Sequence, residues 1–175
     1  MSFESGRQDD CADIVPGGTL LDDVDSGLPN YMFYSPDLDH DGHDPTNDRP
    51  VGLIKASRWL ERFLEPLLND PRFTERTLTI ITFDESGTLL LPDDNHIYTV
   101  LLGDMVKPGI YCEPYNHFNV LRTIEDNFHL RPLAENGGDG CAKVIEGVWL
   151  PDSSEAPGVK RECPAFPEIT GARGS

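Results

Sequence analysis

A continuous apolar stretch runs over residues 77–83 and ends on two adjacent carboxylates, Asp84 and Glu85. It is rich in β-branched residues and shows no polar alternation, which is typical of a strand buried on both faces of a parallel α/β sheet. Because a buried strand cannot carry charge in its middle, the two acids are expected at its carboxyl end, where open α/β sheets bind ligands. The alternative is a solvated turn in which Asp84 caps a helix.

Apolar positions at helical spacing predict two amphipathic helices. The first covers residues 50–69, where Pro66 should kink or end the helix and the sequence Asn69-Asp70-Pro71 should stop it. The second covers residues 118–128 and has Asn116 as its N-terminal cap.

Two more strands are predicted, a short aromatic one at residues 28–34 and another at residues 97–102. The succession of helix and strand predicts an α/β fold, namely part of a doubly wound, mainly parallel sheet with flanking helices. We expect this domain to occupy residues 28–150. Residues 1–27 are expected to form a loose acidic leader, and residues 151–175 a flexible tail.

Composition limits the classes of partner. The 175 residues suffice for one domain with a core, and 38% of them are hydrophobic. A formal net charge of -17 argues against binding to nucleic acid or to anionic membranes, and it fits cation binding or a solvated acidic surface. No stretch reaches the length of a transmembrane segment. The oligomeric state is left open.

Residues 37–48 match the start of a calcium loop, with acids at positions 1, 3, 5 and 12 and glycine at position 6. Three features oppose an EF-hand. The preceding residues are strand-like and interrupted by Pro36, Asp44 and Pro45 occupy positions 8 and 9, and there is no second loop to pair with. An acidic calcium-binding or interaction module and a plain acidic turn remain alternatives.

Five short motifs occur in a fixed order along the chain. They are Asp41-Gly42-His43-Asp44, Thr82-Phe83-Asp84-Glu85, Asn95-His96-Ile97, Leu101-Leu102-Gly103 and Tyr115-Asn116-His117-Phe118. In this order and at these intervals the chain resembles the phosphoesterase family of bacterial phospholipases C and of bacterial and fungal acid phosphatases. The likeness covers roughly residues 28–130. It implies the C-terminal half of an alkaline-phosphatase-like fold.

The resemblance implies hydrolysis of phosphate esters with a divalent metal cation held by Asp84 and Glu85, whose hard oxygen donors suit such an ion. A histidine beside a carboxylate can keep one tautomer, bind phosphate or protonate a leaving alkoxide. A histidine in the first turn of a helix lies where anions are favoured. The residues expected to bind phosphate or pass protons are His43, His96 and His117, supported by Asp44 and Asn95.

Phosphoesterases of this kind carry an upstream serine or threonine nucleophile and an early Glu-Asn metal-ligand step. We find neither in these residues and expect a C-terminal half with weak or no hydrolysis of its own. The substrate, a phosphomonoester or a phospholipid head group, is left open. A non-catalytic relic that keeps the fold is the second alternative.

The cysteines Cys11, Cys112, Cys141 and Cys163 form no C-x-x-C pair, which argues against a structural zinc site. The resemblance implies secretion in many members, where four cysteines could form two disulfides. We expect Cys112 and Cys141 to pair if any bridge forms. The N-terminal residues lack the basic and apolar regions of a signal peptide, so the compartment is left open.

Overall fold

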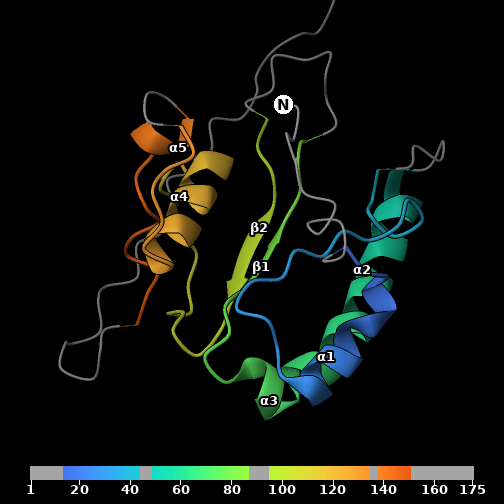
Figure 1. Cartoon of the computed structure of the whole chain (residues 1–175). Coiled ribbons are helices and arrows are strands. Elements are labelled where there is room, and N and C mark those ends of the chain that lie inside the picture. The colour runs from blue at the N-terminus through green and yellow to red at the C-terminus, as the bar shows by residue number, and fades with distance from the viewer. Residues whose placement is uncertain (1–13, 44–48, 87–94, 135–137, 151–175) are drawn as a thin grey trace, which may run out of the picture. The chain divides into compact units, whose positions relative to one another are not determined.

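The computed structural model describes residues 14–43, 49–86, 95–134 and 138–150. It is mixed α/β and divides into two units, Met1–Asp104 and Met105–Ser175. The elements of both are labelled in Figure 1.

The first unit contains three α-helices, a 3-10 turn and both described strands. They are η2 (Gly17–Thr19), α1 (Leu20–Ser26), α2 (Arg49–Leu68), α3 (Pro71–Thr74), β1 (Thr79–Thr82) and β2 (Thr99–Leu102). The second unit contains α4 (His117–Asn127) and α5 (Gly138–Cys141), with a bridge between Val106 and Trp149.

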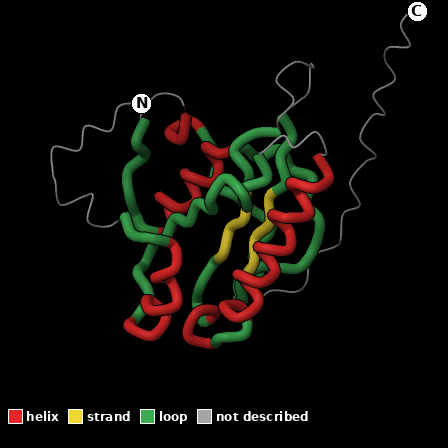
Figure 2. Tube along the Cα trace, turned by 90° about the vertical axis from the view of Figure 1, so that its right-hand side faces the viewer, coloured by secondary structure: helices red, strands yellow, loops and turns green. Residues whose placement is uncertain are grey.

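The described sheet has two antiparallel strands, with Thr79 opposite Leu102 and Thr82 opposite Thr99 (Figure 2). The hydroxyl groups of Thr82 and Thr99 lie 2.8 Å apart. A strand at residues 77–83 was correctly predicted, but its residues are half-buried or exposed, and the described pairing is not parallel. A run of β-branched residues predicts a strand, yet it carries no information on the direction of the neighbour. Antiparallel neighbours also occur at the edges of mixed sheets.

Helix α2 confirms the first predicted helix, although Pro66 lies inside its last turn instead of ending it. The stop comes after Leu68, as the Asn69-Asp70-Pro71 step predicted. Asp70 caps α3 by accepting a hydrogen bond from the Arg72 amide, and Pro71 takes the first helical position, where its missing N–H costs nothing.

Helix α1 departs from the loose leader that we expected up to residue 27. Leu20 and Val24 lie one turn apart on it, and Val24 is buried with Leu67 and Phe73 in the core of the unit. The helix forms because these apolar residues gain partners from α2 and α3, which the local composition does not reveal.

Residues 28–34, all described, form no strand, so that prediction was wrong. Of their three aromatic side chains, Tyr31 and Phe33 are exposed, and Tyr34 packs against α2. The Tyr34 ring lies 4.5 Å from Phe63 and 5.9 Å from Trp59, and these two α2 rings stack 4.9 Å apart, measured between centroids.

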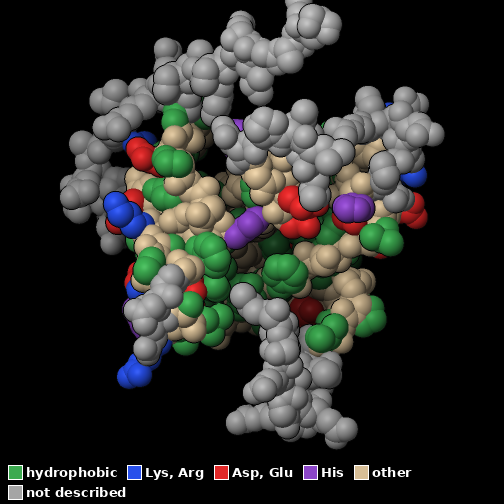
Figure 3. All heavy atoms as spheres, turned by 90° about the horizontal axis from the view of Figure 1, so that it is seen from above, with side chains coloured by type: hydrophobic (Ala, Val, Ile, Leu, Met, Phe, Trp, Pro, Cys, Tyr) green, Lys and Arg blue, Asp and Glu red, His purple; other side chains and the backbone are tan. Residues whose placement is uncertain are grey.

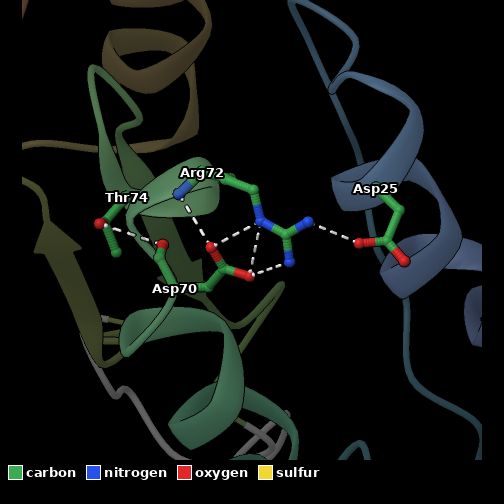
Figure 4. A network of polar contacts seen from close by, with 4 residues as sticks. All are labelled: Asp25, Asp70, Arg72 and Thr74. Carbon is green, nitrogen blue, oxygen red and sulfur yellow. Dashed lines mark hydrogen bonds and ion pairs between the residues drawn. The ribbon is translucent and has the colours of Figure 1, made fainter.

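A polar cluster joins α1 to α3 (Figure 4). The Arg72 guanidinium donates to Asp25 Oδ1 and Asp70 Oδ2, each at 2.6 Å, and Thr74 donates its hydroxyl to the Asp70 carbonyl at 3.2 Å. Hydrogen bonds from the Arg72 side chain and amide hold the pKa of Asp70 below its usual range.

Helix α4 confirms the second predicted helix and its cap. The Asn116 side chain accepts hydrogen bonds from the amides of Phe118 and Asn119, and Asn119 Oδ1 accepts from the Asn116 amide at 2.8 Å, which completes a capping box. Along the helix, Asn119 donates to the Lys143 carbonyl and Thr123 Oγ1 accepts from the Ile145 amide, each at 2.8 Å.

Two acids are buried in the second unit, Glu125 on α4 and Asp139 on α5, each 3% exposed. Glu125 Oε1 accepts from the Leu133 amide at 3.1 Å, and both Asp139 oxygens lie 3.2 Å from the Ala134 amide. Burial raises the pKa of Asp139, but hydrogen bonds, that from the Ala134 amide foremost, outweigh it and leave the pKa lowered.

The predicted pairing of Cys112 with Cys141 was wrong. Cys112 is in a disulfide, whereas Cys141 is an exposed thiol. Cys11 and Cys163 lie outside the described residues. None of the helices in the described ranges is both long and apolar enough to cross a bilayer.

Candidate functional site

Two predicted site segments come together in the first unit through Gly42 and Phe83. A Cβ placed on Gly42 would lie 3.5 Å from Phe83 Cε1, 3.8 Å from Leu53 Cδ2 and 3.9 Å from Ala56 Cβ. Gly42 directly precedes His43, and Phe83 directly precedes Asp84. The histidine loop therefore packs against the end of β1 and the first turns of α2.

The loop that carries His43 is held by its own polar groups. The Asp37 carbonyl accepts from the amides of His40 and Asp41 at 2.9 and 3.0 Å, and Asp41 Oδ1 accepts from the His43 amide at 2.8 Å. Gly42 has φ 85°, a left-handed value that glycine adopts without strain. His43 is exposed. Asp44 lies outside the described residues, so its pairing with His43 stays a prediction.

His40 has a structural role that we missed in the sequence. It is half-buried, its Nδ1 lies 2.6 Å from Asp37 Oδ1, and its ring centroid lies 5.6 Å from that of Trp59. His40 thereby fastens the loop to α2. The sequence signal for this contact was the Asp-x-x-His spacing of residues 37 and 40, because side chains three residues apart can meet across one turn of the chain.

The loop's contacts do not favour the calcium-binding alternative. Asp37 bonds to His40, Asp41 bonds to the His43 amide, and Asp39 lies 3.9 Å from Lys55 Nζ. Each acid thus has a different partner. The described residues hold no group of three or more His, Cys, Asp or Glu side chains placed to bind one metal ion.

The acid pair lies where the sequence predicted it, just beyond β1. Asp84 and Glu85 are exposed, as is His96, which precedes β2. The Ser86 amide donates to Asn95 Oδ1 at 2.8 Å. The segment after β1 and the segment before β2 therefore meet just beyond the Thr82–Thr99 end of the ladder. Figure 3 shows histidine and acidic side chains on the face seen from above.

His117 belongs to the second unit, where it is the exposed first residue of α4. We predicted that this helix N-terminus favours an anion. The amides of Phe118 and Asn119 already donate to Asn116 Oδ1, at 3.0 and 3.4 Å. These two amides are therefore already used by the cap, and the role predicted for His117 stays a prediction.

The carboxylate pair fits part of a divalent cation site. Mg²⁺ is often held by one or two protein carboxylates together with water and substrate phosphate, and Asp84 and Glu85 supply two exposed carboxylates of this kind. They do not by themselves form a closed cage.

The family model of the Phosphoesterase family matches residues 12–131. The chain belongs to this family. The match confirms the resemblance read from the five motifs and begins before α1, in agreement with the packing of that helix into the core.

Relatives share about a third of the residues over the matched region. A probable acid phosphatase of Kluyveromyces lactis is 34% identical over 69% of the chain and 27% of its own length, and an acid phosphatase of Aspergillus niger is 37% identical over 66% of the chain and 27% of its own length. A phosphatidylinositol-3-phosphatase of Mycobacterium tuberculosis is 35% identical over 70% of the chain and 37% of its own length. The chain thus spans well under half of these relatives. No solved structure matches it significantly.

Proposed function

We propose that the chain supplies part of the active site of a phosphoesterase that hydrolyses phosphate monoesters. The observation that carries the proposal is the packing of Gly42 against Phe83, which brings the His43 loop beside the strand end with Asp84 and Glu85. The family match and the phosphatase names of the relatives support the reaction class.

Asp84 and Glu85 hold the divalent cation in this proposal. A cation held by these carboxylates would supply positive charge to neutralise the charge that develops on the phosphoryl oxygens. Without a cation, the two carboxylates beyond the end of β1 repel a negatively charged phosphate. The phosphate ester should therefore bind more tightly when the cation is present.

His43 follows the glycine that packs against Phe83, and His96 follows the asparagine bonded to the Ser86 amide. In this proposal the two histidines bind phosphoryl oxygens or protonate the leaving alkoxide. A phosphate-binding role for His117, on α4 of the second unit, stays a prediction from the sequence. Asp44 keeps His43 in one tautomer, and Asn95 supports the carboxylates. We assign no residue of the sequence as the nucleophile.

The fold expected for the whole enzyme is a doubly wound sheet of the alkaline-phosphatase-like kind. β1 would be one strand of its parallel part, with β2 as an antiparallel neighbour. The ester is either a small phosphomonoester or a phosphorylated lipid head group, because the relatives are named for acid phosphatase and for phosphatidylinositol-3-phosphatase activities.

A chimera tests the proposal. The matched 120-residue region of the Aspergillus niger enzyme is replaced by the corresponding region of this chain, and p-nitrophenyl phosphate hydrolysis is measured at mildly acidic pH with a chelator control. We expect an active chimera that His43→Ala and Asp84→Asn each reduce at least about 100-fold, on the order expected for groups that act as a unit.

His129→Asn is the matched control, because His129 has φ 55° and asparagine tolerates that backbone. It should leave hydrolysis unchanged. An active chimera that is insensitive to both site substitutions would contradict the assigned roles.

A further inference from the structure

The bond between Ser86 and Asn95 closes the connection between the two strands. The Ser86 amide donates to Asn95 Oδ1 at 2.8 Å, across nine positions of sequence. On the other side of the acid pair, Thr82 and Thr99 pair in the ladder, and their hydroxyl groups lie 2.8 Å apart. The stretch from Phe83 to Glu85 is therefore fastened on both sides.

Asparagine suits this position for two separate reasons. Its φ of 49° is left-handed, a conformation that asparagine, aspartate and glycine adopt more readily than other residues. Its side-chain carbonyl supplies the acceptor that the Ser86 amide requires. Glycine would meet only the first requirement, and aspartate would meet both.

Fastening matters for two exposed carboxylates. An exposed acidic turn samples many backbone conformations, and a ligand that needs both carboxylates must offset that entropy when it binds. Closing the turn by hydrogen bonds before binding removes part of this cost. Groups that orient the residues of a metal site typically change metal affinity about 10- to 100-fold when they are lost.

We propose that Asn95 is a positioning residue that holds Asp84 and Glu85 in their cation-binding arrangement through the Ser86 amide. The inference rests on the proposed cation site. It assigns Asn95 no contact with the cation or the phosphate, because its Oδ1 is used by Ser86.

Two variants separate the acceptor from the backbone requirement. Asn95→Gly keeps the left-handed backbone and loses the acceptor, whereas Asn95→Asp keeps both and adds a negative charge. Ser86→Ala is the matched control, because it removes a hydroxyl beside the acid pair and leaves the donating amide in place. Far-UV circular dichroism checks that all three are folded.

The first measurement is titration calorimetry with Mg²⁺, Mn²⁺, Ca²⁺ and Zn²⁺, each alone. We expect Asn95→Gly to weaken binding by about tenfold or more, and Asn95→Asp and Ser86→Ala to bind at least nearly as tightly as the unaltered chain. Equal affinity in Asn95→Gly and the unaltered chain would overturn the inference and leave the proposed site standing. Binding that is absent, or that survives Asp84→Asn with Glu85→Gln, would overturn the site itself and the inference with it.

The second measurement needs no metal. Amide hydrogen exchange by NMR should show a protected amide at position 86 in the unaltered chain, in Ser86→Ala and in Asn95→Asp, and exchange roughly fivefold faster in Asn95→Gly. A Ser86 amide that exchanges as fast in the unaltered chain as in Asn95→Gly would overturn the inference.

Discussion

The Phe83 ring lies 3.5 Å from where a Cβ on Gly42 would stand, so a methyl group added to that glycine would be in van der Waals contact with the ring. This contact seats the histidine loop on the end of β1. It fixes the chain path on both sides, because Gly42 precedes His43 and Phe83 precedes Asp84. Gly42 and Phe83 thus link the two motifs in space.

Gly42→Ala should destabilise the loop through its backbone. The space around the position allows a methyl group, but φ 85° is unfavourable for alanine, so we expect a loss of about 1 kcal/mol in the free energy of unfolding. Urea denaturation measures it. Gly42→Asn should lose less. Gly18→Ala, at a glycine with nothing within 4 Å of an added Cβ, is the control and should be close to neutral. Equal losses at both glycines would contradict this account.

The Asp70–Arg72 cluster should make the first unit acid-sensitive. The pKa of Asp70 is lowered in the folded chain, so the stabilisation is complete above its unfolded pKa of about 4 and is lost as pH falls through the folded value. Urea midpoints measured from about pH 6 to about pH 2 should therefore fall below about pH 4.

Two variants check the assignment to this cluster. Asp70→Asn should lower the midpoint near neutral pH and flatten its pH dependence, since the titrating group is gone. Arg72→Lys keeps the charge but loses the paired guanidinium contacts, so it should lose most of the same stabilisation. An unchanged pH profile in Asp70→Asn would show that another carboxylate is responsible.

Asp139 should give the second unit a separate acid transition of the same sign. Its pKa is lowered although burial opposes this, so protonation at low pH weakens its bonds to the Ala134 amide. Trp149, whose Nε1 donates to the Ile145 carbonyl at 2.8 Å, is a probe within that unit. With Trp59→Phe it becomes the sole tryptophan. The unfolding midpoint reported by Trp149 fluorescence should depend less on pH in Asp139→Asn. Its pH dependence should be unchanged in Asp70→Asn.

The two long helices were predictable because their signals are local. The apolar period and the Asn69-Asp70-Pro71 stop define α2, and Asn116 with Asn119 defines the start of α4. Both signals lie within a few residues of the element that they specify, so neither depends on the rest of the fold.

Other features depend on residues distant in sequence. Tyr34 packs on Phe63 instead of pairing in a ladder, and Val24 becomes helical and buried only because Leu67 and Phe73 cover it. The direction of β2 and the partner of Cys112 likewise follow from long-range geometry, which composition and spacing do not encode.

Only those features of the site that depend on local sequence signals were predicted. The position of Asp84 and Glu85 beyond a strand follows from the strand pattern itself. The role of His40 required knowledge of Trp59, which lies on another element, and the Ser86–Asn95 bond required the ladder register. The roles proposed for His43, His96 and His117 remain predictions.

The most direct test of the proposed cation site is calorimetric titration of divalent cations into two double variants. Asp84→Asn with Glu85→Gln removes the proposed ligands. Asp39→Asn with Asp41→Asn removes two carboxylates of the acidic loop at residues 37–48. The side-chain amide introduced at position 41 keeps an oxygen that can accept from the His43 amide. We predict that the first double variant loses most of the binding and that the second keeps nearly all of it. The reverse ranking would contradict the proposed site and favour cation binding by the acidic loop.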